Sequence, residues 1–224
     1  MTKSIQIALD GPAAAGKSTI AKIVAEKLGY IYIDTGAMYR AITLKALNAG
    51  VDLASSEQTG KLLMNTQIDL QPSDDGQLVF LDGKNVSEDI RSQSVTSNVS
   101  LIASHESVRQ RMVELQQQLA SGRGVVMDGR DIGTDVLPNA ELKVFMSASV
   151  EERARRRYEE NLKRGFDTPL ADLQKEIAAR DKMDSERVVS PLRQAEDAIF
   201  LDTTELTIEE AASEILKLAE ERLK

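Results

Sequence analysis

Cysteine is missing from this 224-residue chain, and histidine occurs only once, as His105. The absence of cysteine excludes disulfide bonds, thiolate metal sites and cysteine nucleophiles. A single histidine leaves almost no material for a histidine metal cage or a serine–histidine relay. The chemistry of the protein therefore falls to other residue types.

Long apolar runs and an excess of positive charge are lacking as well. No run reaches the roughly 18 apolar residues of a membrane-spanning helix, and the N-terminal MTKSIQIALD has no signal-peptide core. The 28 Lys and Arg against 36 Asp and Glu give a net charge of −8. This balance argues against a nucleic-acid or anionic-membrane partner. We expect a cytoplasmic protein, a monomer, whose phosphate sites are local arginine clusters.

Short runs of β-branched and aliphatic residues predict the strands of the fold. Several read as continuously apolar, as strands buried on both faces do. Helical patterns separate most of them, which is typical of a parallel sheet wrapped by helices, an α/β fold. The five predicted strands lie at 4–9, 30–33, 124–128, 142–146 and 198–202.

Two helical segments are clear from their apolar spacing. The first follows the glycine-rich turn after the first strand and ends at Gly29, a predicted C-cap. The second closes the chain and has acidic residues near its start. Its predicted inward face comprises Ile208, Ala212, Ile215, Leu216 and Ala219.

Two stretches interrupt the strand–helix alternation. Residues 66–87 alternate in polarity and contain two Asp-Gly pairs, Asp75-Gly76 and Asp82-Gly83, which predict small antiparallel hairpins. We expect them to form an insertion in a single domain that spans residues 1–224. Residues 151–187 are dense in charge, which by composition alone indicates a solvated helical face.

The turn after the first strand matches the pattern G-x-x-x-x-G-K-[ST] without a mismatch. Its glycines let backbone amides and a helix N-terminus surround an anion. Lys17 then reaches the β- and γ-phosphates of a nucleoside triphosphate, and the Ser18 hydroxyl can ligate Mg²⁺. A chance match in a turn is the alternative. The residues of this predicted P-loop are Gly11, Pro12, Ala13, Ala14, Ala15, Gly16, Lys17, Ser18 and Thr19.

Carboxylates and arginines follow the other strands. Asp128 ends a buried strand, where a P-loop protein holds its magnesium shell, and Asp34 is either a second support for magnesium waters or a helix N-cap. Two charged sets are each spaced to share a helix face. They are Arg153, Arg156 and Arg157, which could close over phosphates, and Arg180, Asp184 and Arg187, which could equally be a surface ion-pair ladder.

A set of motifs in a fixed order resembles the cytidylate kinase family of nucleoside monophosphate kinases, over essentially the whole chain. In chain order the motifs are the P-loop, DTGAMYR, DGRDIGT, ERARRR and RDKMDSERVVSPL. The resemblance implies a P-loop NTPase fold with a monophosphate-binding region at 35–120, enlarged by the 66–87 insertion, and a helical lid at 151–187. It implies a (d)CMP kinase of pyrimidine nucleotide metabolism, with ATP and Mg²⁺ as cofactors and CMP and dCMP as substrates.

The resemblance also implies roles for individual residues. ATP would lie on the P-loop and on Arg153, Arg156 and Arg157, with Mg²⁺ on Ser18 and Asp128. Lys17, Arg130, Arg157 and Arg187 would be catalytic. CMP would contact Thr35, Arg40, Ser100, Arg109, Arg130, Asp131, Arg180, Asp184 and Arg187. Within that set, Arg40, Arg130 and Arg187 would hold the phosphate, and Arg180 with Asp184 the sugar.

The base-reading trio implied by the resemblance is Ser100, Arg109 and Asp131. A carboxylate only accepts and suits the N4 amino group of cytosine, whereas arginine only donates and suits N3 or O2. Uracil would place a carbonyl against the carboxylate. Read without the resemblance, Ser100 and Arg109 would be an ordinary helix serine and a surface arginine.

Two other readings stay open. One is a kinase for UMP, AMP or a small metabolite, and the other is a nucleotide-dependent switch or binding module. No guanine-reading Asn-Lys-x-Asp occurs. The arginines suited to a second phosphate favour a kinase. Because the attacking phosphate oxygen is already largely ionised at neutral pH, such a kinase needs no general base.

Overall fold

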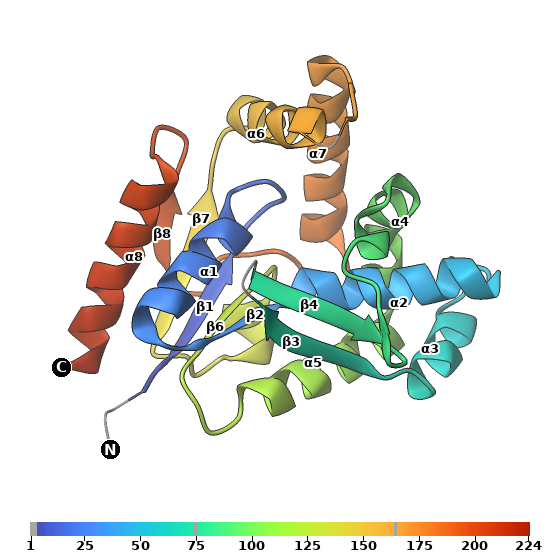
Figure 1. Ribbon diagram of the computed structural model, residues 1–224, viewed down its shortest axis with the longest axis horizontal. Coiled ribbons are helices and arrows are strands. Elements are labelled where there is room, and N and C mark those ends of the chain that lie inside the picture. Colours follow the sequence, from blue (N-terminus) through green and yellow to red (C-terminus); the bar gives the residue numbers. More distant parts are fainter. Residues whose placement is uncertain (1–3, 74–75, 164) are drawn as a thin grey trace.

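The computed structural model describes residues 4–73, 76–163 and 165–224. At its centre lies a five-stranded parallel sheet in the order β2-β6-β1-β7-β8 (Figure 1). Its strands are β1 (Gln6–Asp10), β2 (Ile31–Asp34), β6 (Val125–Gly129), β7 (Leu142–Ser147) and β8 (Ile199–Asp202). Each overlaps one of the predicted strands, so the predicted α/β fold is confirmed.

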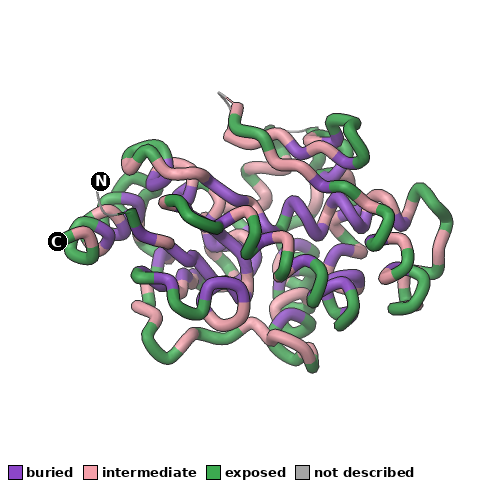
Figure 2. Tube along the Cα trace, turned by 90° about the horizontal axis from the view of Figure 1, so that it is seen from below, coloured by how far each residue is buried: buried purple, intermediate pink, exposed green. Residues whose placement is uncertain are grey.

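Helices cover both faces of this sheet. On one face, α1 (Lys17–Leu28) and α8 (Ile208–Leu223) pack together against β1 and β7. On the other face, α5 (Glu106–Ala120) and the short helix η2 (Ile132–Val136) cover β2 and β6. Figure 2 shows the buried segments in the interior of the molecule and exposed residues along the outer faces of the helices. Burial on both faces explains why these strands read as continuously apolar.

The predicted insertion is a second, antiparallel sheet of β3 (Ile68–Ser73), β4 (Gly76–Leu81) and β5 (Lys84–Asn85). The turn at Asp82-Gly83 has positive φ angles of 49° and 81°. Asp75 lies outside the described residues. The sheet shares a separate core with α2 (Thr35–Ala49), α3 (Ser56–Met64), η1 (Asp89–Arg91), α4 (Gln93–Ser104) and part of α5.

One side chain joins the insertion to the edge of the central sheet. Gln77 of β4 donates from Nε2 to the backbone oxygen of Tyr32 at 2.6 Å. Its Oε1 accepts from the backbone nitrogen of Asp34 at 3.1 Å. The amide thus satisfies the exposed edge of β2 as a neighbouring strand would.

The charged region forms two helices, α6 (Val150–Lys163) and α7 (Leu170–Glu186), which stand beside the carboxyl end of the sheet (Figure 1). They pack on each other through Ala154, Leu173 and Ile177. Since α7 ends at Glu186, Arg187 does not share a helix face with Arg180 and Asp184 as predicted; it has an extended ψ of 143°. The backbone nitrogen of Leu192 donates to the Asp184 carbonyl at 2.8 Å and so satisfies one of the free carbonyls in the last turn of α7.

The C-terminal helix differs from its prediction at one residue. Ala212, Ile215 and Ala219 are buried as predicted, but the Ile208 side chain is 45% exposed. Ile208 is the first residue of α8 and lies inside the capping box, between Thr207 and Glu210. It precedes the turn at which Ala211 and Ala212 enter the core. None of the helices in the described part of the chain combines the length and apolar composition that crossing a bilayer demands.

Candidate active site

The P-loop joins β1 to α1 in a conformation that only glycine accepts at its start. Gly11 has a φ of 148°, and a β-carbon there would overlap the backbone oxygen of Met146 in β7. Gly16 has a φ of 86° at the N-cap of α1. The residues from Ala13 to Thr19 line a cavity of about 320 Å³. A helix N-terminus and a tight loop therefore border this cavity, as an anion site requires.

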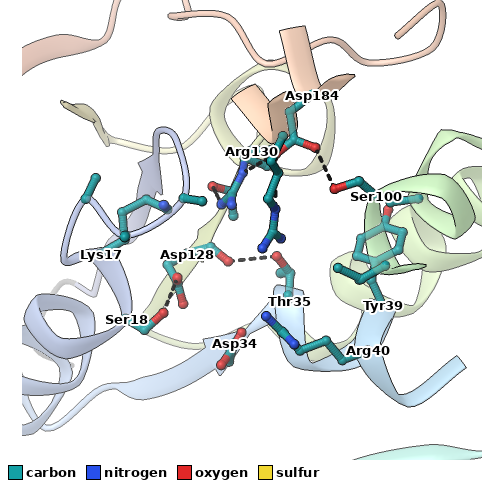
Figure 3. Close-up of a pocket in the computed structure, with 18 of the residues that line it drawn as sticks. Lys17, Ser18, Asp34, Thr35, Tyr39, Arg40, Ser100, Asp128, Arg130 and Asp184 are labelled. Carbon is teal, nitrogen blue, oxygen red and sulfur yellow. Dashed lines mark hydrogen bonds and ion pairs between the residues drawn. The ribbon is translucent and has the colours of Figure 1, made fainter. Parts of the chain in front are cut away.

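Lys17 lies over this loop. Its side chain is buried, and Nζ donates to the backbone oxygen of Pro12 at 2.7 Å. Burial lowers the pKa of the Lys17 ammonium well below its ordinary value, and Arg130 acts in the same direction. Figure 3 shows Lys17 and Ser18 entering the cavity from the P-loop side. Gly11 and Pro12 are not among the residues that line the cavity.

Ser18 and Asp128 place two oxygen atoms that could ligate a metal ion at the floor of the cavity. The Ser18 hydroxyl donates to Asp128 Oδ2 at 2.8 Å, and the Tyr32 hydroxyl donates to Oδ1 at 2.8 Å. Burial raises the pKa of Asp128 to about 6. The described residues contain no cluster of three or more His, Asp or Glu that could hold a metal ion alone. One hydroxyl and one carboxylate suit Mg²⁺, which takes most of its other ligands from phosphates and water.

Arginines from four segments form the opposite wall of the cavity. Arg40 comes from α2, Arg130 follows β6, Arg180 lies on α7 and Arg187 follows it. Burial lowers the pKa of Arg40 to about 10, and the charges of Arg157 and Arg130 add to that effect. Burial and then Arg130 lower the pKa of Arg180 to about 9. Buried guanidinium groups that disfavour one another's charge indicate a site for an anion.

Asp184 organises this wall. Its Oδ2 accepts from Arg130 Nε at 2.9 Å and lies 3.9 Å from Arg180 Nε. Its Oδ1 accepts from the Ser100 hydroxyl at 3.4 Å. Burial raises the pKa of Asp184, but Arg130 and Arg180 outweigh burial and leave it below its ordinary value. Figure 3 shows Arg130 and Asp184 together, opposite Lys17, with Ser100 beyond them.

Asp131 and Arg109 form an ion pair at the far end of the cavity. Arg109 is 1% exposed, so it is not the surface arginine that its sequence context alone suggests. It also donates to the backbone oxygen of Ala103 at 3.1 Å and lies over the ring of Tyr39, 5.6 Å from its centroid. A buried carboxylate and a buried guanidinium there can present an acceptor and a donor to one ligand.

Several residues that line the cavity have buried polar atoms without hydrogen-bond partners. They include Tyr39 OH, Arg109 Nε, Arg180 Nε and Arg187 Nη2, all buried. Native proteins satisfy nearly all buried polar atoms. A cluster of unsatisfied ones on the wall of a cavity indicates that a polar ligand completes the site.

Sequence reasoning missed two residues here. Tyr39 lies four residues after Thr35 on α2, a helical spacing that could have identified it. Asp10, the last residue of β1, accepts from the backbone nitrogens of Ile132 and Gly133 at 2.8 and 2.7 Å. Burial raises the pKa of Asp10 to about 7. No sequence pattern pointed to Asp10, because its partners are far away in the chain.

Asp34 and Thr35 lie where α2 begins. Asp34 is the N-cap: its Oδ1 accepts from the backbone nitrogen of Ala37 at 2.9 Å. Thr35 donates from its hydroxyl to the backbone oxygen of Asp128 at 2.7 Å, which ties α2 to the end of β6. Both residues line the cavity.

The three arginines of α6 lie on one helix as their spacing predicts, but their side chains have different environments. Arg153 is buried, pairs with Asp181 at 2.7 Å and donates to the backbone oxygen of Ala13 at 3.2 Å. Arg156 donates to the backbone oxygen of Thr203 at 2.5 Å. Of the three, only Arg157 lines the main cavity. Because α6 crosses over the P-loop, its three arginines contact different parts of the molecule.

A second cavity of about 430 Å³ adjoins the P-loop on the other side. Arg156 and Arg157 of α6 line it, together with the first turn of α8 and the loop before it. Ile208, the apolar side chain left exposed at the start of α8, is among its lining residues. The second cavity therefore combines an apolar side chain with residues of the P-loop and the arginines of α6.

The sequence was compared with protein families, curated proteins and solved structures. The cytidylate kinase family model matches residues 7–221. A protein of Lysinibacillus sphaericus named cytidylate kinase is 65% identical over 223 residues, covering 100% of both chains. One of the same name from Bacillus subtilis is 61% identical, covering 99% of both chains.

Among solved structures, a protein of Eubacterium ventriosum has a TM-score of 0.54 at 11% identity, covering 98% of this chain and 99% of that one. At that identity the likeness concerns the fold alone. The family model and the full-length relatives agree with the order of the motifs along the sequence. The chain belongs to the cytidylate kinase family.

Proposed function

We propose that this protein transfers the γ-phosphoryl group of ATP to CMP or dCMP, giving ADP and the nucleoside diphosphate. The observation that carries the proposal is one cavity with two facing walls for anions, a P-loop with Lys17 and a set of buried arginines. A phosphoryl transfer between two nucleotides needs both walls, because donor and acceptor phosphates must meet in line. The curated name of the full-length relatives supports the same activity.

The arginine wall suits the phosphate of the acceptor nucleotide. Arg40, Arg130 and Arg187 approach the cavity from different segments. Guanidinium forks match phosphate oxygens and stay charged. A bound dianion would also offset the burial, and the repulsion between arginines, that lower the pKa of Arg40 and Arg180. Arg180 and Asp184 would then contact the sugar of the nucleotide.

The pair of Asp131 and Arg109 suits the pairing edge of cytosine. Asp131 accepts hydrogen bonds and fits the N4 amino group, while the unpartnered Nε of Arg109 fits a ring acceptor. Uracil presents a carbonyl where cytosine has the amino group, so the carboxylate disfavours it. Ser100 lines the same cavity, and its hydroxyl would help to read the base beside Asp131 and Arg109.

The P-loop wall suits MgATP. Ser18 and Asp128 would hold Mg²⁺, which supplies neutralisation of charge on the transferring phosphoryl group. The second cavity, with Ile208 and the stem of Arg156, offers an apolar slot for the adenine of the same nucleotide. Bound phosphates would favour the charged form of Lys17, whose ammonium would then offset their negative charge. No protein side chain has to remove a proton, because the attacking oxygen belongs to an ionised phosphate.

Helices α6 and α7 would act as the lid of this site. Arg157 lines both cavities, at the point where the two nucleotides would meet. A lid that closes there excludes water that would hydrolyse ATP. The net charge of −8 disfavours a nucleic-acid partner. In the proposal the protein acts on small nucleotides as a cytoplasmic monomer.

The test is a coupled assay of ADP release with ATP and Mg²⁺ across CMP, dCMP, UMP, AMP and GMP. We expect turnover with CMP and dCMP, weaker turnover with UMP and none with the purine nucleotides. Activity on AMP with none on CMP would overturn the assignment of the base-reading pair. ADP release without any acceptor would favour a nucleotide-dependent switch.

A further inference from the structure

Arg187 is held from behind by residues outside the cavity. Its Nε donates to the backbone oxygen of Ser190 at 2.6 Å. Its Nη2 is buried, lies 3.6 Å from Asp131 Oδ1 and has no hydrogen-bond partner. The guanidinium is therefore fixed along one edge, which leaves the other edge for a ligand in the cavity.

Ser190 supplies that carbonyl from a strained backbone. Its φ of 48° lies in the left-handed region, which a non-glycine residue occupies only when its surroundings hold it there. Its hydroxyl donates to Asp135 Oδ1 at 3.0 Å. A side chain that anchors a strained residue next to a binding arginine points to a functional constraint rather than to a loop of arbitrary shape.

Asp135 connects this anchor to the base-reading end of the cavity. Its backbone nitrogen donates to the backbone oxygen of Asp131 at 2.9 Å, within the turn that begins η2. Its second carboxylate oxygen accepts from the Thr134 hydroxyl at 2.6 Å. Neither Asp135 nor Ser190 is among the residues that line the cavity.

We propose that Asp135 and Ser190 are positioning residues that set the orientation of Arg187 and couple it to the loop that carries Asp131. The inference rests on the proposed function, in which Arg187 binds the acceptor phosphate. Without the contact of the Ser190 hydroxyl with Asp135, the Ser190 carbonyl no longer fixes Nε. The guanidinium fork then loses its alignment with the phosphate. Misplacement of a binding group by about 1 Å costs on the order of 100-fold in rate.

The experiment is a double-mutant cycle on kcat/KM for CMP. Ser190→Ala should lower it by about 10-fold and Arg187→Ala by about 100-fold, with KM for ATP unchanged in both. In the Arg187→Ala background, Ser190→Ala should change kcat/KM by less than about twofold, because its effect passes through Arg187. Ser185→Ala, an exposed serine whose hydroxyl donates to its own helix at Asp181 O, is the matched control and should match wild type.

A further variant separates positioning from folding. Ser190→Gly also removes the hydroxyl but relieves the positive φ. We expect it to lose as much kcat/KM as Ser190→Ala while melting at a higher temperature than that variant.

The results that would overturn the proposal are specific. If Ser190→Ala lowered kcat/KM equally in the wild-type and Arg187→Ala proteins, Ser190 would have a general structural role. The same conclusion would follow if the activity of the variants followed their melting temperatures. Wild-type activity in Ser190→Ala would remove Ser190 from the site. Wild-type activity in Arg187→Ala would overturn the proposed positioning together with the role of Arg187. Turnover of CMP by the wild type in the same assay tests the proposed function separately.

Discussion

The two walls of the cavity are built in opposite ways. The P-loop wall is one continuous stretch, Gly11 to Thr19, whose shape follows from glycine φ angles and from the helix that starts at Lys17. The arginine wall is assembled from α2, α7 and the segments that follow β6 and α7. A contiguous wall is readable as a motif, whereas a dispersed wall exists only after the chain has folded. Substitutions in the two walls should therefore affect catalysis in different ways.

The largest effect is expected from the P-loop wall. Lys17→Ala should lower kcat on the order of 1,000-fold, because it removes the buried charge held over the loop. Lys61→Ala is the control, since that lysine is exposed and pairs with Glu57 on α3. Steady-state rates with CMP, together with circular dichroism, measure the effect. A loss below tenfold in a folded variant would contradict the role of Lys17.

Arg157 lines both cavities, so its replacement should slow transfer of the phosphoryl group rather than weaken the binding of one nucleotide. Arg157→Ala should lower kcat about 100-fold while KM for CMP changes less than about threefold, as expected for a contact made to the transferring group. The exposed Arg111→Ala on α5 is the control. Equal losses in kcat and in CMP affinity would count against closure of α6 over the phosphates.

Asp128 provides a test by pH. The folded chain binds a proton there with a pKa of about 6, against 3.8 for an unperturbed carboxyl. Because the carboxyl binds its proton more tightly in the folded than in the unfolded chain, protonation of Asp128 stabilises the fold. This contribution to the free energy of unfolding is fully present below about pH 4 and is lost as the pH rises to about 6. Relative to Asp128→Asn, the wild-type free energy of unfolding should fall by about 3 kcal/mol over that range.

Urea unfolding of both proteins with EDTA, at several pH values, measures this difference. A difference that does not change with pH would mean that burial does not perturb the carboxyl. Addition of MgATP should then stabilise the wild type more than Asp128→Asn, because the variant lacks a carboxylate for the metal.

The smallest effect concerns Asp131, which we propose reads the base. Asp131→Asn should lower the preference for CMP over UMP by about tenfold, since an amide can donate to the uracil carbonyl that a carboxylate repels. The ratio of kcat/KM values for the two substrates measures it. The exposed Asp172→Asn on α7 is the control. An unchanged ratio would move base discrimination to other residues, such as Tyr39.

Local patterns predicted the elements well because each pattern has its own physical cause. The continuous apolar runs are strands buried on both faces, and Gly29 ends α1 in the left-handed conformation. The prediction for Ile208 was wrong because periodicity does not show where a helix first meets its neighbour. The prediction that Arg187 shares a helix face with Asp184 was wrong because α7 ends at Glu186, one residue before Arg187.

For this protein, the sequence by itself determined the parallel sheet, the P-loop and the family, because these depend on short-range periodicity, glycine conformation and the order of motifs. Only the tertiary structure decided which charges share a cavity. It separated Arg153 from Arg157, buried Arg109 against Asp131 and set Asp10 behind the site. The physical reason is that these contacts join residues distant in the chain, and the electrostatic energy of a charge depends on its neighbours in space.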